Sequence, residues 1–599
     1  MDLWRHGELN PEQEAAIKEP GNILLTACPG SGKTRTLTYK AAYELSRLKS
    51  SRQFVCAITY THRAADEIHD RIERLGVDTS QLWIGTIHSF CLEWILKPYG
   101  IYHGSLSRGF RVIDAHEREA LLTELCGQYD GMKVTIWNCE FFFTSERCVI
   151  STTNPALREA VQEVLRRYFR RLAELKAIDF ELILFRAHQI LKTRPGIAKI
   201  LSNIFPYVLV DEYQDTKEIQ YSIVASILRA GAGAGATSAF IVGDPNQAIY
   251  MSLGGYAIPH ADLEAMANVK FKPLALSKNY RSSRRVVDYF SNYKVHKTAI
   301  VAEGKDKDHV GTISYNDTVT KDGLEDELVR LIRHSIEDCG FAPGEICVIA
   351  PWWTHLASMT RKLVARLPEY PFDGPGMVPF GRDYDNFWFK VSRLALTVAA
   401  PDLYVRRLRW ANEVLRDMTE AGVTTAGITP KVLLRACNCI VLDDSDGLVY
   451  LRKFFAELFQ SLNINFMQFD VLHKHYVAFF ESSQARVDKL KRDGLECISG
   501  TEVFRRVFRT RTGITVSSIH GIKGAEFDAV IAYALLEGMV PHFGDAEGEE
   551  GAKKLLYVVA SRAKKNLHLI SERERLNRKA EYMPTVVLAD CAYRYDVVP

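Results

Sequence analysis

Residues 23–36 read ILLTACPGSGKTRT, and this stretch decides the fold. An apolar run predicts a buried strand, the segment Gly30-Ser31-Gly32-Lys33-Thr34 predicts a glycine-rich loop, and a helical pattern follows. Backbone N–H groups in such a loop, together with the N-terminus of the next helix, form a cradle for anions. Lys33 would reach the β- and γ-phosphates of a nucleotide, and Thr34 would be a ligand of Mg²⁺. Ala27 stands where this pattern usually has its first glycine.

Three further apolar runs, at residues 55–59, 208–210 and 240–242, each end at a polar or glycine-bearing loop. Helical patterns separate these runs along the chain. Fully apolar strands that alternate with helices predict a parallel sheet covered on both faces. In such sheets ligands bind at the carboxyl ends of the strands, where the glycine-rich loop begins.

The chain divides into two α/β lobes, each with a mostly helical insertion. The insertions are recognised by long helical patterns near residues 95–195 and 380–510, and the α/β pattern resumes at 514–516 and 529–531. The length of 599 residues leaves room for several cores. The predicted boundaries are 1–94 with 196–278 for the first lobe, 95–195 for its insertion, 279–380 with 511–599 for the second lobe, and 381–510 for a reduced second insertion.

Two carboxylates follow the apolar run of VLVDEYQDT, at Asp211 and Glu212. Asp211 is placed to hold a metal ion, while Glu212 is placed to orient or deprotonate an attacking water. A strand-terminal Asp-Glu pair on its own also fits the cap of the next helix. Together with the glycine-rich loop, the pair predicts hydrolysis of a nucleoside triphosphate.

Phosphoryl transfer also needs positive charge near the γ-phosphate. Arg281 in LSKNYRSS and Arg562 in YVVASRAKK stand in compact settings, although each taken singly fits a surface or ion-paired arginine. Their predicted place in the second lobe would let them complete the site when the lobes close. The stretch GDPNQAIYMSLGGY, residues 243–256, begins as a turn after a strand and carries Gln247.

Composition is that of an ordinary globular protein, with 47% hydrophobic and 25% charged residues and a net charge of +3. A polyanionic partner would therefore need a local basic groove. The 12 cysteines include no C-x-x-C pair, which argues against a zinc ribbon or disulfide framework and for a reducing compartment. No signal-peptide core or membrane-spanning run is recognised, so a cytoplasmic protein without a membrane partner is expected.

Ten segments in one order resemble the UvrD/Rep/PcrA family of superfamily 1 helicases. The resemblance covers nearly the whole chain and is weakest at 380–510. The segments are LNPEQEAAI (9–17), ITYTHRAADEIHDRI (58–72), GTIHSFC (85–91), IDFELIL (178–184), VDEYQDT (210–216), GDPNQAIY (243–250), NYRSS (279–283), SSIHGIKGAEFDAVI (517–531), EGMVP (537–541) and LYVVASRA (556–563).

The resemblance implies two RecA-like P-loop lobes, ATP and Mg²⁺ as cofactors, and movement from 3′ to 5′ on single-stranded DNA or on DNA with a single-stranded tail. It also implies a role for each matching residue. Gln13 would read the adenine, Arg35 would lie beside the nucleotide and Glu526 would contact the ribose. Asp211 and Glu212 would serve Mg²⁺ and water, Gln247 would sense the γ-phosphate, and Arg281 and Arg562 would clamp it. The phosphates would be held by the loop residues Ala27, Cys28, Pro29, Gly30, Ser31, Gly32, Lys33 and Thr34. DNA would be contacted by Thr61, His62, Thr86, His88 and His520.

One segment departs from the family's pattern. After the tyrosine of GDPNQAIY the family usually has an aromatic residue and then an arginine, where this chain has Ser252 and Leu253. The aromatic stacks on a base, at about 1–3 kcal/mol per base. Tyr250 or Tyr256 would be the substitute ring, while Tyr60, Phe90 and Trp83 are predicted to be core aromatics.

Two functions remain open from the sequence. The first is an ATP-dependent DNA helicase or translocase. The second is a helicase-fold ATPase that senses DNA or nucleotide and controls a partner nuclease, as in short UvrD-like chains of antiphage defence such as the Gabija helicase-like subunit. The altered segment at 251–253 and the reduced insertion motivate the second function. A helicase–nuclease fusion is disfavoured, because too few residues follow Arg562 for an appended nuclease domain.

Overall fold

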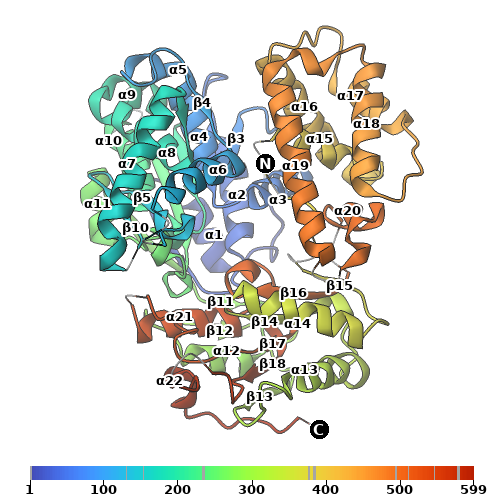
Figure 1. The fold of residues 1–599 in the computed structure, drawn as a ribbon. Helices are drawn as coiled ribbons and strands as arrows, with labels where there is room; N and C mark the ends of the chain where they lie inside the picture. The colour runs from blue at the N-terminus through green and yellow to red at the C-terminus, as the bar shows by residue number, and fades with distance from the viewer. Residues whose placement is uncertain are drawn as a thin grey trace. The chain divides into compact units, whose positions relative to one another are not determined.

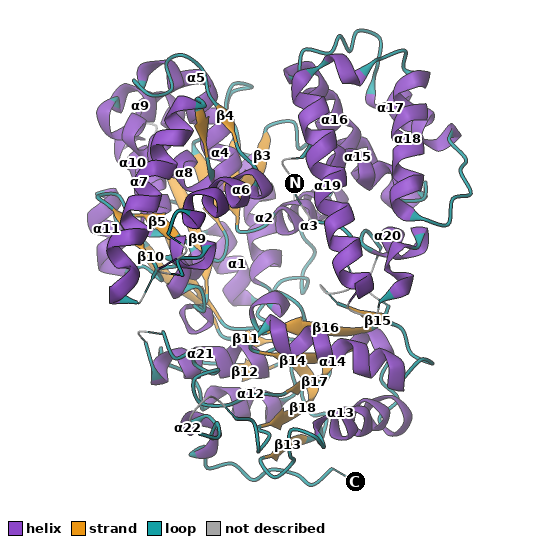
Figure 2. Cartoon of the chain, in the orientation of Figure 1, coloured by secondary structure: helices purple, strands orange, loops and turns teal. Residues whose placement is uncertain are grey.

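The structure is a computed structural model that describes residues 3–129, 131, 133–152, 154–231, 237–374, 378–381, 383, 386–492, 495–509, 512–545, 547–576 and 580–598. The chain forms two compact units. The first contains residues 1–315, 536–567 and 582–599, and the second contains residues 316–535 and 568–581. Figures 1 and 2 show the fold by position along the chain and by secondary structure.

A six-stranded sheet of order β10-β1-β9-β8-β2-β3 is the centre of the first unit. All five pairings between neighbouring strands are parallel, as the apolar runs predict. The strands are β1 (Ile23–Ala27), β2 (Val55–Thr59), β3 (Leu82–Thr86), β8 (Tyr207–Val210), β9 (Ser238–Gly243) and β10 (Lys272–Leu276). Their carboxyl ends lie at one edge, which is where the predicted site residues follow them.

Helices cover both faces of this sheet. On one face Ile23 and Leu25 of β1 pack with Leu37 of α2 and Ile68 of α3. On the other face Leu24 of β1 joins a core that includes helices of the insertion. Because successive residues of a strand point to opposite faces, strands buried on both sides must be apolar throughout. The helices flanking the sheet are α1 (Pro11–Lys18), α2 (Lys33–Leu45), α3 (His62–Arg74), α4 (Ile87–Phe90), α9 (Pro195–Ile204), α10 (Glu218–Gly231) and α11 (His260–Ala267).

The first insertion is mostly helical, as its sequence pattern predicts. Its helices are α5 (Lys97–Tyr99), α6 (Ala115–Gly127), α7 (Arg158–Glu174) and α8 (Phe180–Thr193). Two small ribbons join them, β4 (Arg111–Val112) paired with β7 (Ala177–Ile178), and β5 (Phe141–Phe143) paired with β6 (Cys148–Ile150). The core of this insertion is continuous with one face of the sheet, so the insertion is anchored to the strands that carry the site.

The first unit extends beyond residue 278, where the sequence analysis ends the first lobe. It includes α12 (Arg284–Ser291), α21 (Glu549–Ala560), α22 (Val586–Ala589) and the strand pair β11 (Lys278–Asn279) with β12 (Val301–Ala302). Arg281 and Arg562 therefore belong to the same unit as the glycine-rich loop. The limits of the two RecA-like lobes stay a prediction.

A second six-stranded sheet has the order β13-β18-β17-β14-β16-β15, and the boundary between the units falls within β13 and β18. Strand β14 is parallel to both β16 and β17, and β15 is parallel to β16. The strands are β13 (Ile313–Asn316), β14 (Ile346–Ala350), β15 (Phe372–Asp373), β16 (Ile514–Ser518), β17 (Phe527–Ala532) and β18 (Ala563–Ile570). Helices α13 (Leu324–Arg333) and α14 (Trp353–Arg366) accompany this sheet. Two parallel α/β sheets with helical insertions confirm the predicted fold class.

The second insertion has a core of its own around Trp388, which is completely buried. Its helices are α15 (Phe387–Ala395), α16 (Tyr404–Glu420), α17 (Pro430–Cys439), α18 (Gly447–Ser461), α19 (Asp470–Arg492) and α20 (Thr501–Arg506). Over the described part of the chain, no helix has the length and apolarity needed to cross a membrane.

Candidate active site

The glycine-rich loop lies between β1 and α2, as predicted. Gly30 and Gly32 have φ angles of +66° and +81°, a region that favours glycine. A Cβ on Gly30 would lie 2.5 Å from Cβ of Arg281, and one on Gly32 would lie 2.8 Å from Nε2 of Gln13. Gly32 is also the N-cap of α2, so Lys33 and Thr34 begin the helix whose N-terminus faces the loop. Because this cradle requires glycine and ends at a helix N-terminus, the loop residues fit a phosphate group.

Gln13 is held against this loop by its own helix. Asn10 caps α1, and Gln13 completes a capping box in which its side-chain oxygen accepts from the backbone N–H of Asn10 at 3.0 Å. The side-chain Nε2 of Gln13 donates to the carbonyl of Ser31 at 3.0 Å. On the first turn of α2, Arg35 lies 3.6 Å from Glu8 and over the ring of Tyr39. The predicted adenine-side residues Gln13 and Arg35 therefore both border the loop.

Asp211 follows β8 and is almost completely buried, with its N–H donating to the carbonyl of Ile58 at 2.9 Å. Burial, and then the charge of Glu212, raise the pKa of the Asp211 carboxyl to about 7, while Lys33 acts in the opposite direction. A buried carboxylate with this cost favours a bound cation. In the described residues no group of three or more His, Cys, Asp or Glu is placed to hold a metal, and a Mg²⁺ ion held by one carboxylate and phosphates does not need one.

Glu212 has a left-handed backbone with φ of +52°, which is strained for a residue that is not glycine. Its N–H donates to Oδ1 of Asp211 at 3.0 Å. Its side-chain Oε2 accepts from Nε2 of Gln214 at 2.6 Å, and Oε1 of Gln214 accepts from the N–H of Asp244 at 2.9 Å. Gln214 therefore ties the end of β8 to the end of β9 and fixes the direction of the Glu212 carboxylate.

Gln247 bridges two partners within this unit. Its Nε2 donates to Oδ2 of Asp244 at 2.7 Å, and its Oε1 accepts from Nη2 of Arg562 at 2.7 Å. Arg562, between the C-cap of α21 and the start of β18, has only 2% of its surface exposed. The hydroxyl of Tyr557 donates to Oδ2 of Asp244 at 3.3 Å. Burial raises the pKa of the Asp244 carboxyl, while Lys33 lowers it. The predicted γ-phosphate residues Gln247 and Arg562 are thus directly bonded.

Arg281 reaches the same cluster through the segment that precedes α12. Nδ2 of Asn279 donates to the carbonyl of Pro29 at 2.7 Å, and the N–H of Tyr280 donates to the carbonyl of Gly30 at 2.9 Å. Arg281 donates from Nη1 to the carbonyl of Ser561, the residue before Arg562, at 3.0 Å. The segment of Arg281 is therefore bonded to the loop, and Arg281 itself is bonded to the residue that precedes Arg562.

Sequence reasoning missed four residues of this network. Asp244 was assigned to a turn, although a carboxylate directly after a parallel strand is the same signal that identifies Asp211. Gln214 stands inside the quoted motif VDEYQDT but received no role. Asn279 and Tyr557 also stand inside quoted motifs, NYRSS and LYVVASRA, but their partners Pro29 and Asp244 are far away along the chain, so the motifs alone do not indicate these contacts.

The comparisons with known proteins address the whole chain. Residues 9–256 match the family model of the UvrD/REP helicase N-terminal domain, and residues 498–574 match that of the UvrD-like helicase C-terminal domain. The chain belongs to the UvrD-like helicases. ATP-dependent DNA helicase UvrD1 of Mycobacterium leprae is 26% identical over 94% of this chain and 82% of its own length. ATP-dependent DNA helicases PcrA of Staphylococcus epidermidis and Leuconostoc citreum are each 24% identical, over 97% and 96% of this chain and 86% and 83% of their own lengths.

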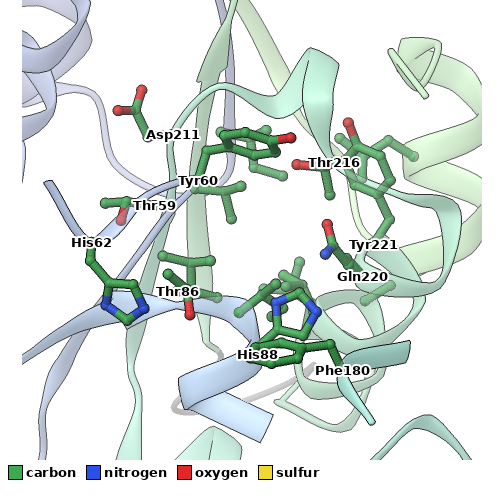
Figure 3. Close-up of a pocket in the computed structure, with 18 residues that line it drawn as sticks. Thr59, Tyr60, His62, Thr86, His88, Phe180, Asp211, Thr216, Gln220 and Tyr221 are labelled. Atoms are coloured by element: carbon green, nitrogen blue, oxygen red, sulfur yellow. The ribbon is translucent and has the colours of Figure 1, made fainter. Parts of the chain in front are cut away.

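Four of the predicted DNA-contacting residues of this UvrD-like helicase lie at the ends of β2 and β3. The hydroxyl of Thr61 caps α3 and accepts from the N–H of Ala64 at 3.2 Å. The hydroxyl of Thr86 caps α4 and accepts from the N–H of Ser89 at 3.2 Å. His62, Thr86 and His88 line one cavity (Figure 3). The threonine hydroxyls therefore have a structural role as helix caps, and their contact with DNA stays a prediction.

Burial, together with the charges of Lys217 and His62, lowers the pKa of His88 to about 3. The imidazole is therefore neutral at physiological pH, and a contact with DNA would be a hydrogen bond rather than an ion pair. Its ring packs edge-on against Phe180 with 5.5 Å between centroids. His88 is thus packed within the fold as well as lining the cavity.

The prediction that Tyr60 is a core aromatic is wrong, because its ring is partly exposed. Its side chain is 45% exposed and stacks on Tyr250, with 5.4 Å between centroids and 30° between planes. Phe90 is completely buried, as predicted, and Trp83 packs edge-on against it while its Nε1 donates to Glu93 at 2.7 Å. Sequence alone could not separate the three rings, because the exposure of a ring depends on packing between segments that are far apart along the chain.

The departure at 251–253 forms a short 3₁₀ helix, Met251–Leu253, with Leu253 52% exposed. The ring beside it is Phe142 of β5, because a Cβ on Gly254 would lie 2.8 Å from that ring. Tyr256 instead donates its hydroxyl to Asp262 at 3.1 Å. The aromatic side chains around this segment are thus Phe142 and the Tyr60–Tyr250 pair.

His520 and Glu526 belong to the second unit. His520 begins a 3₁₀ turn, His520–Ile522, which one residue separates from the end of β16. Glu526 directly precedes β17. Their roles toward DNA and the ribose stay predictions.

Proposed function

We propose that this UvrD-like helicase is an ATP-dependent DNA translocase that separates strands while moving from 3′ to 5′ on single-stranded DNA. The observation that carries the proposal is the continuous set of hydrogen bonds within one unit that joins Asp211 through Glu212, Gln214 and Asp244 to Gln247 and Arg562, and joins the phosphate loop to the residue before Arg562. Support also comes from the UvrD1 and PcrA proteins to which the chain is similar, which are ATP-dependent DNA helicases.

Binding of ATP is assigned to the loop and its neighbours. Lys33 and the backbone amides from Gly30 to Thr34 would hold the phosphates, because the helix dipole and the amides favour an anion there. Gln13 and Arg35 would border the base. Thr34 and Asp211 would hold Mg²⁺, which supplies charge neutralisation for the phosphates when bound.

Hydrolysis is assigned to Glu212 and the two arginines. Gln214 fixes the Glu212 carboxylate, which would orient the attacking water and take its proton at Oε1 or Oε2. Arg281 and Arg562 would stabilise the negative charge that develops on the γ-phosphate. Because these side chains are already bonded to fixed partners, they need little rearrangement at the moment of reaction.

Residues 244–250 connect hydrolysis with the DNA side. Asp244 and Gln247 contact Tyr557 and Arg562, while Tyr250 stacks on the exposed ring of Tyr60. A change in the hydrogen bonds of Gln247 would therefore be transmitted over a few residues to a ring that faces solvent. We propose that this segment couples nucleotide state to the grip on DNA.

The proposal is tested by DNA-stimulated ATPase activity of Lys33→Ala and Glu212→Gln. We expect both to lose activity by at least about 100-fold, because each removes a group that acts on the transition state. Lys49→Ala and Glu146→Gln change exposed residues of the same types and are the matched controls. Hydrolysis at the wild-type rate in both site variants would overturn the assignment.

A second candidate function is favoured by the segment Met251–Leu253. Ser252 and Leu253 provide neither the ring nor the positive charge usual at these positions, so strand separation could be weak. The chain would then sense DNA or nucleotide and control a partner nuclease. Unwinding of a tailed duplex by the purified chain, measured beside its ATPase activity, separates the two functions. Strong unwinding without a partner would exclude the second.

A further inference from the structure

A cavity of about 220 Å³ lies beneath the carboxyl ends of β2, β8 and β9 in the first unit. Its floor is aliphatic and buried, and its mouth is marked by Tyr60 and Phe180, which are 45% and 38% exposed. For comparison, an engineered apolar cavity of about 150 Å³ in another protein contains no water and binds benzene. The aliphatic side chains of the lining are Ile58, Ile87, Val210, Val224, Ala225, Leu228, Ile241 and Leu263.

Aromatic and polar groups border this aliphatic floor. Figure 3 shows the rings of Tyr60, His88 and Phe180 around the cavity, and the side chain of Gln220 pointing into it. The side-chain oxygen of Gln220 accepts from the N–H of Lys217 at 3.0 Å, and its amide nitrogen faces the cavity. A few fixed polar groups in an apolar lining are typical of small-molecule sites.

The lining disfavours a charged occupant. Among the described lining residues Asp211 is the only carboxylate, and His88 is neutral at physiological pH because its pKa is lowered to about 3. Asp211 is also directed to the nucleotide site, where Lys33 opposes its charge. A buried charge without a partner costs several kcal/mol, so a neutral ring that packs on aliphatic and aromatic side chains is the ligand that fits.

We propose that this cavity binds an uncharged aromatic small molecule that acts as an effector of the ATPase. The effector role rests on the proposed ATPase function, whereas binding itself is measured without nucleotide or DNA, so the two can fail separately. The walls connect Asp211 at the end of β8 with Thr86 and His88 at the DNA side. An occupant therefore contacts both the catalytic strand and the residues predicted to contact DNA, and we expect it to change the stimulation of hydrolysis by DNA.

The test uses benzyl alcohol as the probe, with benzoate and benzylamine as its anionic and cationic analogues of nearly equal size. Ligand-observed NMR on the full chain without nucleotide would measure binding. We expect saturable binding of benzyl alcohol with a Kd of about 1 mM or lower. Binding of both charged analogues should be at least about 10-fold weaker.

Two variants that fill the cavity with a larger side chain test whether the probe binds there. Ala225→Leu on α10 and Leu263→Phe on α11 enlarge side chains on different walls, and each should lower probe affinity at least about 10-fold. Ile223→Val changes a buried residue of α10 that is outside the lining and should leave affinity unchanged. Far-UV circular dichroism and ATP hydrolysis without DNA show whether each variant is folded, so that at least one folded filling variant decides the result.

Three outcomes would overturn the proposal: no saturable binding, equal binding of the charged analogues, or unchanged binding in a folded filling variant. The same binding measurement with saturating oligo(dT) distinguishes a site for a free ligand from a site for a DNA base. Retained probe binding in that measurement supports a free effector, whereas complete displacement by DNA would assign the cavity to the DNA strand and contradict the effector role.

Discussion

Arg562 illustrates how a buried cation is arranged around a reaction. It donates to Gln247 from Nη2 and to the carbonyl of Val558 from Nε at 3.2 Å, and almost none of its surface is exposed. Gln247 in turn donates to Asp244. Because each partner is held by the next, the guanidinium is positioned before a nucleotide binds, and the three side chains should act as a unit.

We expect Arg562→Ala to lower kcat of the DNA-stimulated ATPase by about 10³-fold, which is the lower range for loss of an arginine at a γ-phosphate. Gln247→Ala should cost about 10²-fold. The double variant should be little worse than Arg562→Ala, because the two residues are in direct contact. Steady-state kinetics of the four proteins measure this cycle. Fully multiplicative losses would show that the hydrogen bond is not part of the function.

Asp211 links pH to stability. Its pKa is raised from 3.8 to about 7, so the ionised form is the one that folding penalises. Its contribution to stability is therefore fully present below about pH 4 and is lost as the pH rises through 7. This carboxyl should therefore make the nucleotide-free protein less stable at pH 8 than at pH 5.

We expect Asp211→Asn to raise the free energy of unfolding at pH 8 by up to about 4 kcal/mol, since one pKa unit is about 1.4 kcal/mol. The gain should shrink toward pH 5, while ATP hydrolysis is abolished at both pH values. Urea unfolding without nucleotide measures the difference, with the exposed Asp322→Asn as control. A variant less stable than wild type at pH 8 would contradict this assignment of charge.

At the scale of elements, the strand ends determine which groups meet. β9 ends at Gly243, where an added Cβ would lie 2.2 Å from Oε1 of Gln214 and 2.9 Å from the backbone nitrogen of Tyr213. Gln214 cannot move without losing its bond to the N–H of Asp244. The absence of a side chain at Gly243 thus lets the segments after β8 and β9 approach each other.

Gly243→Ala should destabilise the first unit by about 1–3 kcal/mol through overpacking, and it should also lower kcat because Glu212 loses its support from Gln214. Urea unfolding and ATPase kinetics on the same preparation measure both effects. Gly127→Ala is the matched control, because its Cβ would meet nothing within 4 Å at the end of α6. We expect this control to be neutral or slightly more stable. A Gly243→Ala variant with unchanged unfolding free energy and unchanged kcat would show that the segments after β8 and β9 can accommodate a Cβ at this position.

At the scale of the whole molecule, the net charge of +3 limits how DNA can be held. Without a broad basic field, affinity must come from a few local phosphate contacts and from rings such as Tyr60. Binding should therefore depend only moderately on salt. This separates the chain from proteins that hold DNA mainly through a large basic surface.

We expect log K for single-stranded DNA to fall with log salt at a slope of about −2 to −4, because about three to five phosphates would be contacted. Fluorescence anisotropy at several salt concentrations, without nucleotide, measures the slope. Lys33→Ala should leave it unchanged, since Lys33 is assigned to the nucleotide. A slope steeper than about −6 would reveal a basic groove that the overall charge does not indicate.

The sequence by itself determined the features that depend on neighbouring residues. The phosphate loop, the buried parallel strands and the carboxylates Asp211 and Glu212 each follow from a short pattern in which spacing along the chain sets the geometry. The order of ten such patterns was also enough to predict the family that the comparisons confirm.

Only the tertiary structure decided the contacts between distant segments. The bond from Arg562 to Gln247, the support of Glu212 by Gln214 and Asp244, and the ring of Phe142 beside Gly254 join residues that no local pattern relates. The exposure of Tyr60 and the cavity beneath it depend on how helices pack over the sheet. The spacing of residues along the chain determines which strand ends are followed by catalytic side chains. Packing determines which of these side chains are in contact, because distances between segments far apart along the chain are defined only once the chain has folded.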